Sequence, residues 1–484
     1  SQEEIIDEIL AHRDVLGVMP TGGGKSICYQ LPALLMPGIT IVISPLISLM
    51  KDQVGALKAA GIPGAFINGA LTPSQTETVI QRAENHAYKL IYVAPERLPM
   101  PRFLRFCEKV DISFVAVDEA HCVSQWGHDF RSAYLAIGDF IAALKQRPVL
   151  AAFTATATEE VRSDIQRLLG LADPAVFISG FDRPNLYFEV RHPKSKFDEL
   201  RRILDTHDHA SGIVYCATRK GVDEVCARLS ALDYAVTRYH AGLSDRERKQ
   251  NQDDFLYDRQ RIMVATNAFG MGIDKSNVSF VIHYNMPKNP ESYYQEAGRA
   301  GRDGSDADCM LLYDKKDIVI NRYFIDHSFG GDDIDAETAQ RMRENELHQL
   351  DQMIRYCTTD QCLRRMLLSY FGEVVPEHCG HCGNCGGDFI TMDRTEEGRL
   401  VLACVSAVRQ RFGLKMITDI LHGSRGKRIL EMGLDGLSVY GALAKTATSE
   451  IKDLIQDMIF GGYLATKEGE YPLILLTEKG YRTL

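Results

Sequence analysis

The sequence predicts an α/β protein with two parallel-sheet lobes, followed by a helical segment with a cysteine cluster and by a small winged-helix unit. Three observations predict this organisation. Short, nearly continuous apolar runs alternate with helical stretches up to about residue 330. Four cysteines stand close together between residues 362 and 385. Beyond residue 397, a helical pattern gives way to an extended, hairpin-like end.

Seven apolar, β-branched runs predict the strands of the two lobes, because such runs between helices are typical of parallel sheets covered on both faces. The first set lies at residues 39–44, 89–94, 114–120 and 149–155, and the second at residues 211–216, 260–266 and 278–284. The two sets are separated near residues 177–185. We therefore expect one lobe over residues 1–180 and another over residues 181–314.

The pattern becomes helical from residue 315. Polar and charged helical sequence at residues 335–357 precedes the cysteine cluster and predicts a helical zinc-binding subdomain over residues 315–390. Helices at residues 397–411, 415–422 and 447–460 come next, with an extended end in which KEGE (467–470) is the tip of a hairpin. Helices followed by a hairpin predict a winged helix over residues 391–484.

Composition and charge narrow the class of protein. Of its residues 45% are hydrophobic and 25% charged, as in a globular protein. We find no apolar run of the roughly 18 residues that a membrane span needs, and the acidic first residues do not form a signal peptide. The net charge of −10 is unfavourable for binding nucleic acid, but residues 392–484 hold 13 basic against 12 acidic side chains. We expect an intracellular protein.

A candidate phosphate-binding loop, MPTGGGKS (19–26), lies between an apolar candidate strand and a helix. Its glycines allow successive backbone N–H groups to point at phosphate oxygens. Lys25 would reach the terminal phosphates and Ser26 would ligate Mg²⁺. The strict motif has a glycine where Met19 stands, so a plain glycine-rich turn is the alternative. The residues expected to hold the nucleotide here are Thr21, Gly22, Gly23, Gly24, Lys25 and Ser26.

Two carboxylates follow the apolar run in FVAVDEAH (114–121). A strand that ends on Asp118 and Glu119 places both at the edge where parallel sheets bind ligands. Asp118 can hold Mg²⁺, and Glu119 can orient or deprotonate the attacking water. A solvated acidic pair is the alternative, and it leaves the preceding apolar run unexplained.

Two arginines, Arg299 and Arg302, lie in SYYQEAGRAGRDG (292–304), which we interpret as a glycine-rich helix start. An arginine supplied across a cleft stabilises the charge that builds on a γ-phosphate during transfer. A solvated face is the common alternative for such a pair. Their position in the second lobe favours the catalytic interpretation.

Twelve cysteines are present, and eight of them are scattered as expected for core residues. The other four have the spacing Cys362-x16-Cys379-x2-Cys382-x2-Cys385. Four thiolates suit a closed, tetrahedral structural Zn²⁺ site. The run is also similar to an iron–sulfur ligand string, which is the alternative.

These motifs together resemble superfamily 2 helicases and, in detail, the RecQ family. DEAH occurs in RNA helicases too, whereas DEAHCVSQWGHDFR is similar to the aromatic-rich loop of RecQ proteins. The resemblance covers most of the chain in the family's order: MPTGGGKS (19–26), VISPLISLMKDQV (42–54), YVAPERL (92–98), DEAHCVSQWGHDFR (118–131), FTATAT (153–158), IVYCATRK (213–220), YHAGLS (239–244), VATNAFGMGIDK (264–275) and SYYQEAGRAGRDG (292–304).

For ATP, the resemblance implies two RecA-like lobes and a set of site residues. It assigns binding and hydrolysis of Mg-ATP to Lys25, Ser26, Asp118, Glu119, Arg299 and Arg302. It adds Gly272 and Asp274 near the ribose and Gln2 as the adenine-reading glutamine. It implies that His121, with Thr154 and Thr156, links nucleotide state to lobe movement. The family has an aromatic-Arg-x-Gly run before that glutamine, whereas this chain starts at Ser1, so we expect incomplete adenine recognition.

For DNA, we expect contacts from the loop after the DEAH motif. Trp126, the only tryptophan, stands among polar residues rather than in an apolar run, and exposed aromatics can stack on bases. The expected contacts are Gln125, Trp126, His128, Phe130 and Arg131. We hypothesise that this loop senses DNA and places Glu119 for hydrolysis. The alternative is that Trp126 and Phe130 fill the core of the lobe.

In the winged helix, the basic stretch HGSRGKR (422–428) either contacts phosphates or is a solvated loop. RecQ-like winged helices dock duplex DNA beside the point of strand separation. The expected tip, KEGE, is short and acidic and has no aromatic wedge, which disfavours strand separation by a prominent hairpin. Members commonly carry a further C-terminal helical domain, which nothing after Leu484 supplies.

The resemblance implies a 3′→5′ DNA helicase of recombination and repair, with ATP, Mg²⁺ and structural Zn²⁺ as cofactors. We expect single-stranded and duplex or branched DNA as partners, no membrane, a monomer, and a single-strand-binding protein as a candidate partner. We expect it in a bacterial cytoplasm, associated with the nucleoid, or in a nucleus. The alternatives are a translocase or RNA helicase, and a DNA-junction binding module with a vestigial ATPase.

Overall fold

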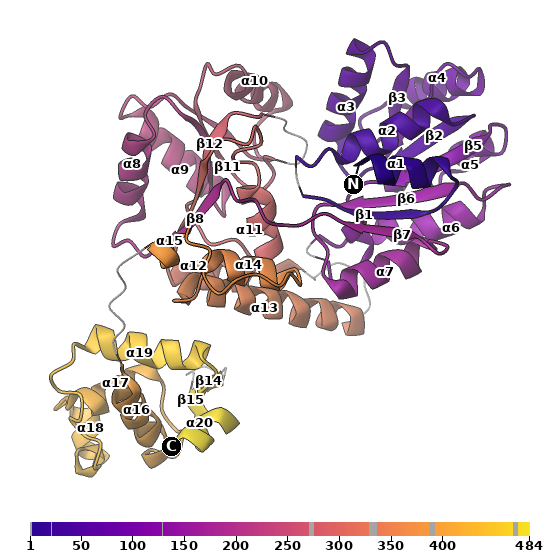
Figure 1. The fold of residues 1–484 in the computed structure, drawn as a ribbon. Coiled ribbons are helices and arrows are strands. Elements are labelled where there is room, and N and C mark those ends of the chain that lie inside the picture. The colour runs from indigo at the N-terminus through magenta and orange to yellow at the C-terminus, as the bar shows by residue number, and fades with distance from the viewer. Residues whose placement is uncertain are drawn as a thin grey trace. The chain divides into compact units, whose positions relative to one another are not determined.

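The structure is a computed structural model that describes residues 2–20, 22–127, 129–270, 275–328, 336–386, 393–467 and 473–484. It divides into two compact units, Ser1–Gly387 and Asp388–Leu484. The first unit holds two parallel sheets with their helices and a helical subdomain, and the second is a small helical unit with a hairpin (Figure 1). In the described part of the chain, no helix is both long and apolar enough to cross a lipid bilayer.

The first lobe is built on a seven-stranded parallel sheet with the order β3-β4-β2-β5-β6-β1-β7. Every residue of β1, β2, β4 and β6 is buried, because helices cover both faces of the sheet. The strands are β1 (Val15–Val18), β2 (Ile39–Ile43), β3 (Gly64–Ile67), β4 (Leu90–Val93), β5 (Ile112–Val117), β6 (Val149–Thr154) and β7 (Ala175–Ile178).

Helices connect these strands. Ile5, Tyr29 and Met50, from the first three helices, share one core with Val42 and Phe153 of the sheet. The helices are α1 (Gln2–Leu10), α2 (Lys25–Leu35), α3 (Ile47–Ala59), α4 (Pro73–Glu84), α5 (Pro101–Cys107), α6 (Ala136–Ala142) and α7 (Glu159–Leu169). Three short 3-10 turns, η1 (Pro95–Arg97), η2 (Ala120–Val123) and η3 (Ser132–Leu135), lie in the loops after β4 and β5.

The second lobe repeats this design with a six-stranded parallel sheet in the order β10-β11-β9-β12-β13-β8. Phe197 and Val225, from its first two helices, pack with Val264 and Ile282 of the sheet. The strands are β8 (Leu186–Arg191), β9 (Ser211–Tyr215), β10 (Val236–Tyr239), β11 (Ile262–Ala265), β12 (Val278–His283) and β13 (Ala307–Leu312). The helices are α8 (Lys196–Thr206), α9 (Arg219–Ser230), α10 (Asp245–Leu256) and α11 (Pro290–Ala297).

A helical subdomain follows the second sheet. Buried Asp317 joins it to the lobe, because its carboxylate accepts hydrogen bonds from Lys196 Nζ at 2.7 Å and from Asn285 Nδ2 at 2.8 Å. The helices are α12 (Lys316–Ser328), α13 (Ala336–Thr358), α14 (Leu363–Tyr370) and α15 (Gly383–Gly386).

The second unit has a core of its own, in which Val405, Ile420, Ile455 and Leu476 are buried together. Its antiparallel hairpin pairs Leu464 with Leu476. The elements are α16 (Thr395–Ala407), α17 (Leu414–His422), α18 (Lys427–Glu431), η4 (Leu434–Gly436), α19 (Thr448–Phe460), β14 (Leu464–Lys467), β15 (Leu473–Leu476) and α20 (Glu478–Thr483).

The predicted fold class is confirmed, and each of the seven apolar runs overlaps a strand. Sequence reasoning missed β3, β7, β8, β10 and β13. The first four are the edges of the two sheets and bury fewer of their residues, so their apolar signature is weaker. The fifth, β13, is internal but directly follows a polar, glycine-rich segment. The division of the first unit into three domains remains a prediction.

Candidate functional site

The phosphate-loop candidate connects the end of β1 to the start of α2. Gly22 and Gly24 have φ angles of +83° and +78°, in the left-handed region that favours glycine. Gly24 caps α2 without a side-chain hydrogen bond, so no capping side chain competes with an anion at the N-terminus of this helix. Lys25 opens the helix, and its Nζ donates to Met19 O at 3.2 Å. Thr21 lies outside the described residues.

Gln2, which the resemblance assigns to adenine, lies against this loop. Its Nε2 donates to Gly23 O at 2.9 Å, although the two residues belong to different elements. The amide of Gly23 in turn donates to Pro20 O at 2.9 Å and closes a tight turn. The glutamine and the loop therefore form one local structure. The predicted ribose contacts, Gly272 and Asp274, lie outside the described residues.

Asp118 and Glu119 follow β5 at the carboxyl edge of the sheet, as predicted. Burial raises the pKa of Asp118 to about 7, the Glu119 charge acts in the same direction, and Lys25 acts against them. Because a nearby cation favours the ionised form of such a carboxyl group, this position fits a Mg²⁺ ligand. Glu119 has φ +47°, a strained value for a non-glycine residue, of the kind found at functional sites. Tyr134 Oη supports this turn by donating to Asp118 O at 2.8 Å.

His121 begins a line of polar contacts that crosses between the lobes. Its Nδ1 lies 3.4 Å from Glu119 Oε2 and 2.8 Å from Thr154 Oγ1. Thr154 Oγ1 donates to Thr156 O at 3.0 Å, and Gln295 Nε2, from α11 of the second lobe, donates to Thr156 Oγ1 at 3.2 Å. Burial lowers the pKa of His121 to about 3, helped by the charges of Lys25 and Arg131, so its ring is neutral.

The structure thus brings together the three residues expected to link nucleotide state to lobe movement. Sequence reasoning missed Gln295, although it stands in the quoted arginine motif. A signal was available there, because a polar amide three residues before Gly298 interrupts an otherwise aromatic and acidic helix.

The two arginines lie after the end of α11 rather than at a helix start, which corrects the sequence-based prediction. The helix ends at Ala297, since Gly298 caps it and Gly301 turns into the left-handed region at φ +55°. Arg299 is 8% exposed and donates to Gly270 O of its own lobe.

Arg302 instead reaches the phosphate loop of the first lobe. A side-chain carbon built on Gly22 would lie 3.6 Å from Arg302 Cγ. The geometry therefore separates two arginines that the sequence leaves equivalent. Arg302 is beside the phosphate loop, and Arg299 supports the second lobe.

The loop after the DEAH motif exposes its tryptophan. Trp126 is 48% exposed, so it does not fill the lobe core, while Phe130 is half-buried. The loop is nevertheless ordered by Ser124, whose Oγ accepts from the Trp126 amide at 3.1 Å and donates to Asp164 at 2.8 Å. Arg131 Nη1 donates to Pro45 O at 3.3 Å and is held by Asp129. His128 lies outside the described residues.

Helix α13 of the helical subdomain also holds this loop. Asn345 Nδ2 donates to Gln125 O at 3.3 Å, and Gln349 Nε2 donates to Trp126 O at 3.2 Å. Gln349 is 4% exposed and accepts from Asn289 Nδ2 of the second lobe at 3.2 Å. Sequence reasoning missed both α13 residues, because more than 200 positions separate them from the loop and no local motif marks them.

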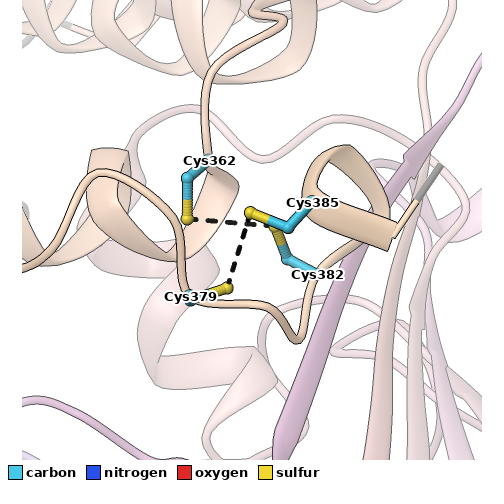
Figure 2. A group of neighbouring side chains, drawn as sticks. All are labelled: Cys362, Cys379, Cys382 and Cys385. Atoms are coloured by element: carbon cyan, nitrogen blue, oxygen red, sulfur yellow. Dashed lines mark hydrogen bonds between the residues drawn. The ribbon is translucent and has the colours of Figure 1, made fainter. Parts of the chain in front are cut away.

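The four predicted cysteines form one cluster. Figure 2 shows their sulfur atoms directed toward one another, with Cys362 at the start of α14 and Cys382 and Cys385 around α15. The four sulfur atoms all lie within 4.8 Å of one another, and the Cys379–Cys385 and Cys362–Cys382 separations are both 4.0 Å. A tetrahedral Zn²⁺ with Zn–S bonds of about 2.3 Å requires sulfurs about 3.8 Å apart, so the residues fit zinc.

The surroundings of the cluster favour the thiolate form of Cys382 more than that of Cys379. Burial opposes ionisation of Cys382, but hydrogen bonds from the backbone of Cys385 and Leu363, together with those from the thiols of Cys385 and Cys379, lower the pKa of its thiol to about 7. Burial raises the pKa of Cys379 to about 12. Metal binding requires deprotonated thiols, so zinc loading releases protons at neutral pH.

In the second unit, the basic stretch at residues 422–428 is solvated at its tip. Arg425, Lys427 and Arg428 are exposed, and Lys427 Nζ lies 3.6 Å from Glu431. The exposure is compatible with both readings of this stretch, contact with phosphates or a solvated loop. Of the expected hairpin tip, residues 468–470 lie outside the described residues.

Four family models match consecutive parts of the chain. They are DEAD/DEAH box helicase at residues 1–164, Helicase conserved C-terminal domain at residues 195–304, RecQ zinc-binding at residues 315–386 and RQC domain at residues 388–484.

Relatives match over almost the whole chain. An ATP-dependent DNA helicase RecQ from Bacillus subtilis is 44% identical over 98% of this chain and 79% of its own length. A protein of the same name from Haemophilus influenzae is 37% identical over 99% of this chain and 76% of its own length. Among solved structures, helicase Lhr of Mycobacterium smegmatis, bound to single-stranded DNA and AMP-PNP, has a TM-score of 0.54 at 18% identity. It covers 99% of this chain and 58% of that one, and at this identity the likeness concerns the fold alone.

Proposed function

Because the chain belongs to the RecQ family of helicases, we propose that it hydrolyses ATP to move along one DNA strand in the 3′→5′ direction and so separates duplex or branched DNA. The observation that carries this proposal is the composite ATP site. Arg302 of the second lobe lies beside the phosphate loop of the first. A site made from two lobes changes shape with each nucleotide state, which is what a motor needs.

Each residue of the site has a proposed role. Lys25 binds the terminal phosphates, and the amides of residues 22–26 cradle them. Ser26 and Asp118 hold Mg²⁺, which when bound neutralises phosphate charge. Glu119 orients the attacking water, and Arg302 stabilises the charge that develops on the γ-phosphate. Gln2 is proposed to contact adenine, with Gly272 and Asp274 near the ribose.

The polar line from Glu119 through His121, Thr154 and Thr156 to Gln295 is proposed to transmit nucleotide state to the second lobe. A neutral His121 suits this position, since it can donate with one ring nitrogen and accept with the other. The hydrogen bond from Gln295 to Thr156 depends on how close the lobes are, so opening of the cleft breaks it first.

DNA is proposed to bind at the loop of residues 122–131. Exposed Trp126 offers a stacking face for a base, and Gln125, His128, Phe130 and Arg131 are the further candidate contacts. The loop begins three residues after Glu119, so a shift of the loop on binding would reach the water-orienting carboxylate. The zinc site is proposed to be structural, because all four cysteines face one another and leave no position for a substrate.

We infer a monomer, a single-strand-binding protein as a candidate partner, and a place of action at chromosomal DNA, in a nucleoid or a nucleus. Recombination and repair are the processes in which relatives of this family act.

The test is unwinding of two DNA duplexes that differ in the end carrying the single-stranded tail. Unwinding of the 3′-tailed duplex with ATP, and little of the 5′-tailed one, is the expected result. An RNA duplex of the same sequence tests the RNA-helicase alternative. DNA binding without DNA-stimulated ATP turnover would instead favour a junction-binding module.

A further inference from the structure

The segment that joins the two lobes, residues 181–185, is held on both sides by arginine side chains. Arg183, inside the segment, donates to the backbone of the loop that carries Arg302. Arg364, from α14 of the helical subdomain, donates to the segment itself. We propose that Arg183 is a positioning residue that holds Arg302 beside the phosphate loop, and that Arg364 fixes Arg183 in turn. This inference rests on the proposed function, because it requires Arg302 to act on ATP.

Arg183 caps the carboxyl end of α11. Its guanidinium lies 3.4 Å from Gly298 O, 3.1 Å from Ala300 O and 2.6 Å from Gly301 O. The carbonyls at a helix C-cap and in the turn beyond it have no partner within the helix, and a cationic donor forms strong hydrogen bonds with them. One side chain thus bonds to three carbonyls of the turn that leads to Arg302.

Gly301 makes this close approach possible. Asn185 Nδ2 donates to Gly301 O at 2.9 Å and to Ser305 O at 2.8 Å, so the joining segment holds the turn at two points. A side-chain carbon on Gly301 would lie 2.4 Å from Asn185 Nδ2 and 2.6 Å from Ser305 O. The turn can therefore adopt this geometry only with glycine at this position, and its carbonyl is fixed one peptide bond before Arg302.

Arg364 fixes the joining segment from the other side. It is 6% exposed, and its Nη1 donates to Asp182 Oδ1 at 2.5 Å and to Arg183 O at 2.7 Å. Its other terminal nitrogen donates to Leu186 O. Arg364 lies two residues after Cys362. One cysteine of the cluster and the arginine that holds the joining segment therefore both lie at the start of α14.

The contacts therefore form a chain from the helical subdomain to the ATP site: Arg364, the joining segment with Arg183, the turn at Gly301, Arg302 and the phosphate loop. Catalysis by an arginine across a cleft depends on its position, and a displacement of about 1 Å can lower a rate on the order of 10²-fold. Loss of Arg183 should lower kcat, since the turn is released, and leave ATP binding by the first lobe in place.

The test is a double-mutant cycle in the full chain that combines Arg183→Ala with Arg302→Ala. DNA-stimulated ATP turnover gives kcat and KM for the wild type, both single variants and the double variant. In the wild-type background, Arg183→Ala should lower kcat roughly 10- to 100-fold and change KM by less than about 3-fold. In the Arg302→Ala background, the same change should alter kcat by less than about 3-fold, because nothing remains to position.

Two further variants separate positioning from folding. Arg183→Lys keeps a cation that reaches fewer carbonyls, so it should give a smaller loss in the wild-type background and none in the Arg302→Ala background. Arg202→Ala, on an exposed arginine of the same lobe, is the matched control and should behave as wild type. Zinc content and thermal unfolding, measured on each variant, report whether the fold is retained.

The outcomes are distinct. Equal losses in both backgrounds, or no loss on Arg183→Ala in the wild-type background, would overturn the positioning role while the proposed function stands. If Arg183→Ala unfolds, the lysine variant decides the question by the same comparison. A wild-type protein without ATP turnover would overturn the proposed function, and this inference with it.

Discussion

Replacing Trp126 by alanine tests whether the loop after the DEAH motif senses DNA. The side chain is 48% exposed, so about half of its surface is available to a base and its removal leaves no enclosed cavity. The loop keeps its main-chain contacts with Ser124, Asn345 and Gln349, because they are made by the backbone at residues 125 and 126. Stacking of one base is worth about 1–3 kcal/mol. The DNA concentration for half-maximal ATPase stimulation should therefore rise about 5- to 150-fold.

The assay measures ATP turnover against the concentration of single-stranded DNA, with basal turnover and thermal unfolding on the same preparations. Basal turnover should be unchanged, and Trp126→Phe should retain part of the response because phenylalanine still offers an aromatic face. Tyr257→Ala, on an aromatic of the second lobe that is 70% exposed, is the matched control. Full stimulation of Trp126→Ala at wild-type DNA concentrations would refute the sensor role, and an unfolded variant would return Trp126 to a packing role.

Three other changes test the phosphate loop, the cysteine cluster and Glu291, a buried carboxyl group of α11. Lys25→Ala should abolish DNA-stimulated ATP turnover with an unchanged melting temperature, and normal turnover in the folded variant would exclude the phosphate-loop assignment. Cys382→Ser should release about one Zn²⁺ per chain and lower the soluble yield, since structural zinc contributes folding free energy; iron and sulfide in the wild type would show a different metal centre. Burial raises the pKa of Glu291 to about 7, against a hydrogen bond from Tyr370, so the folded state binds a proton that the unfolded state gives up at lower pH. The stability gained from this proton is complete below about pH 4.5 and is lost as pH rises through 7, so the melting temperature of the wild type relative to Glu291→Gln should fall over that window. A difference that does not vary with pH would contradict the buried-carboxyl assignment.

The sequence by itself determined the fold class and the groups with local spacing. Parallel strands buried on both faces must be apolar throughout, so β2, β4 and β6 were visible as runs, and the carboxylates after β5 were visible as an abrupt change to charge. The cysteine cluster was visible because three of its ligands lie within one short loop. Edge strands such as β7 were not visible, because a strand with partly exposed residues has a weaker apolar signature.

Only the tertiary structure distinguished Arg299 from Arg302, which share one motif and one residue type. Their difference depends on the end of α11 at Ala297 and on which lobe each side chain meets. Three more side chains form hydrogen bonds with partners far away in the chain. The partner is 139 positions away for Gln295, 223 for Gln349, and 115 to 118 for Arg183. A hydrogen bond between distant segments imposes no periodicity on either of them. Such a hydrogen bond forms only when the sheets, the joining segment and the helical subdomain pack together.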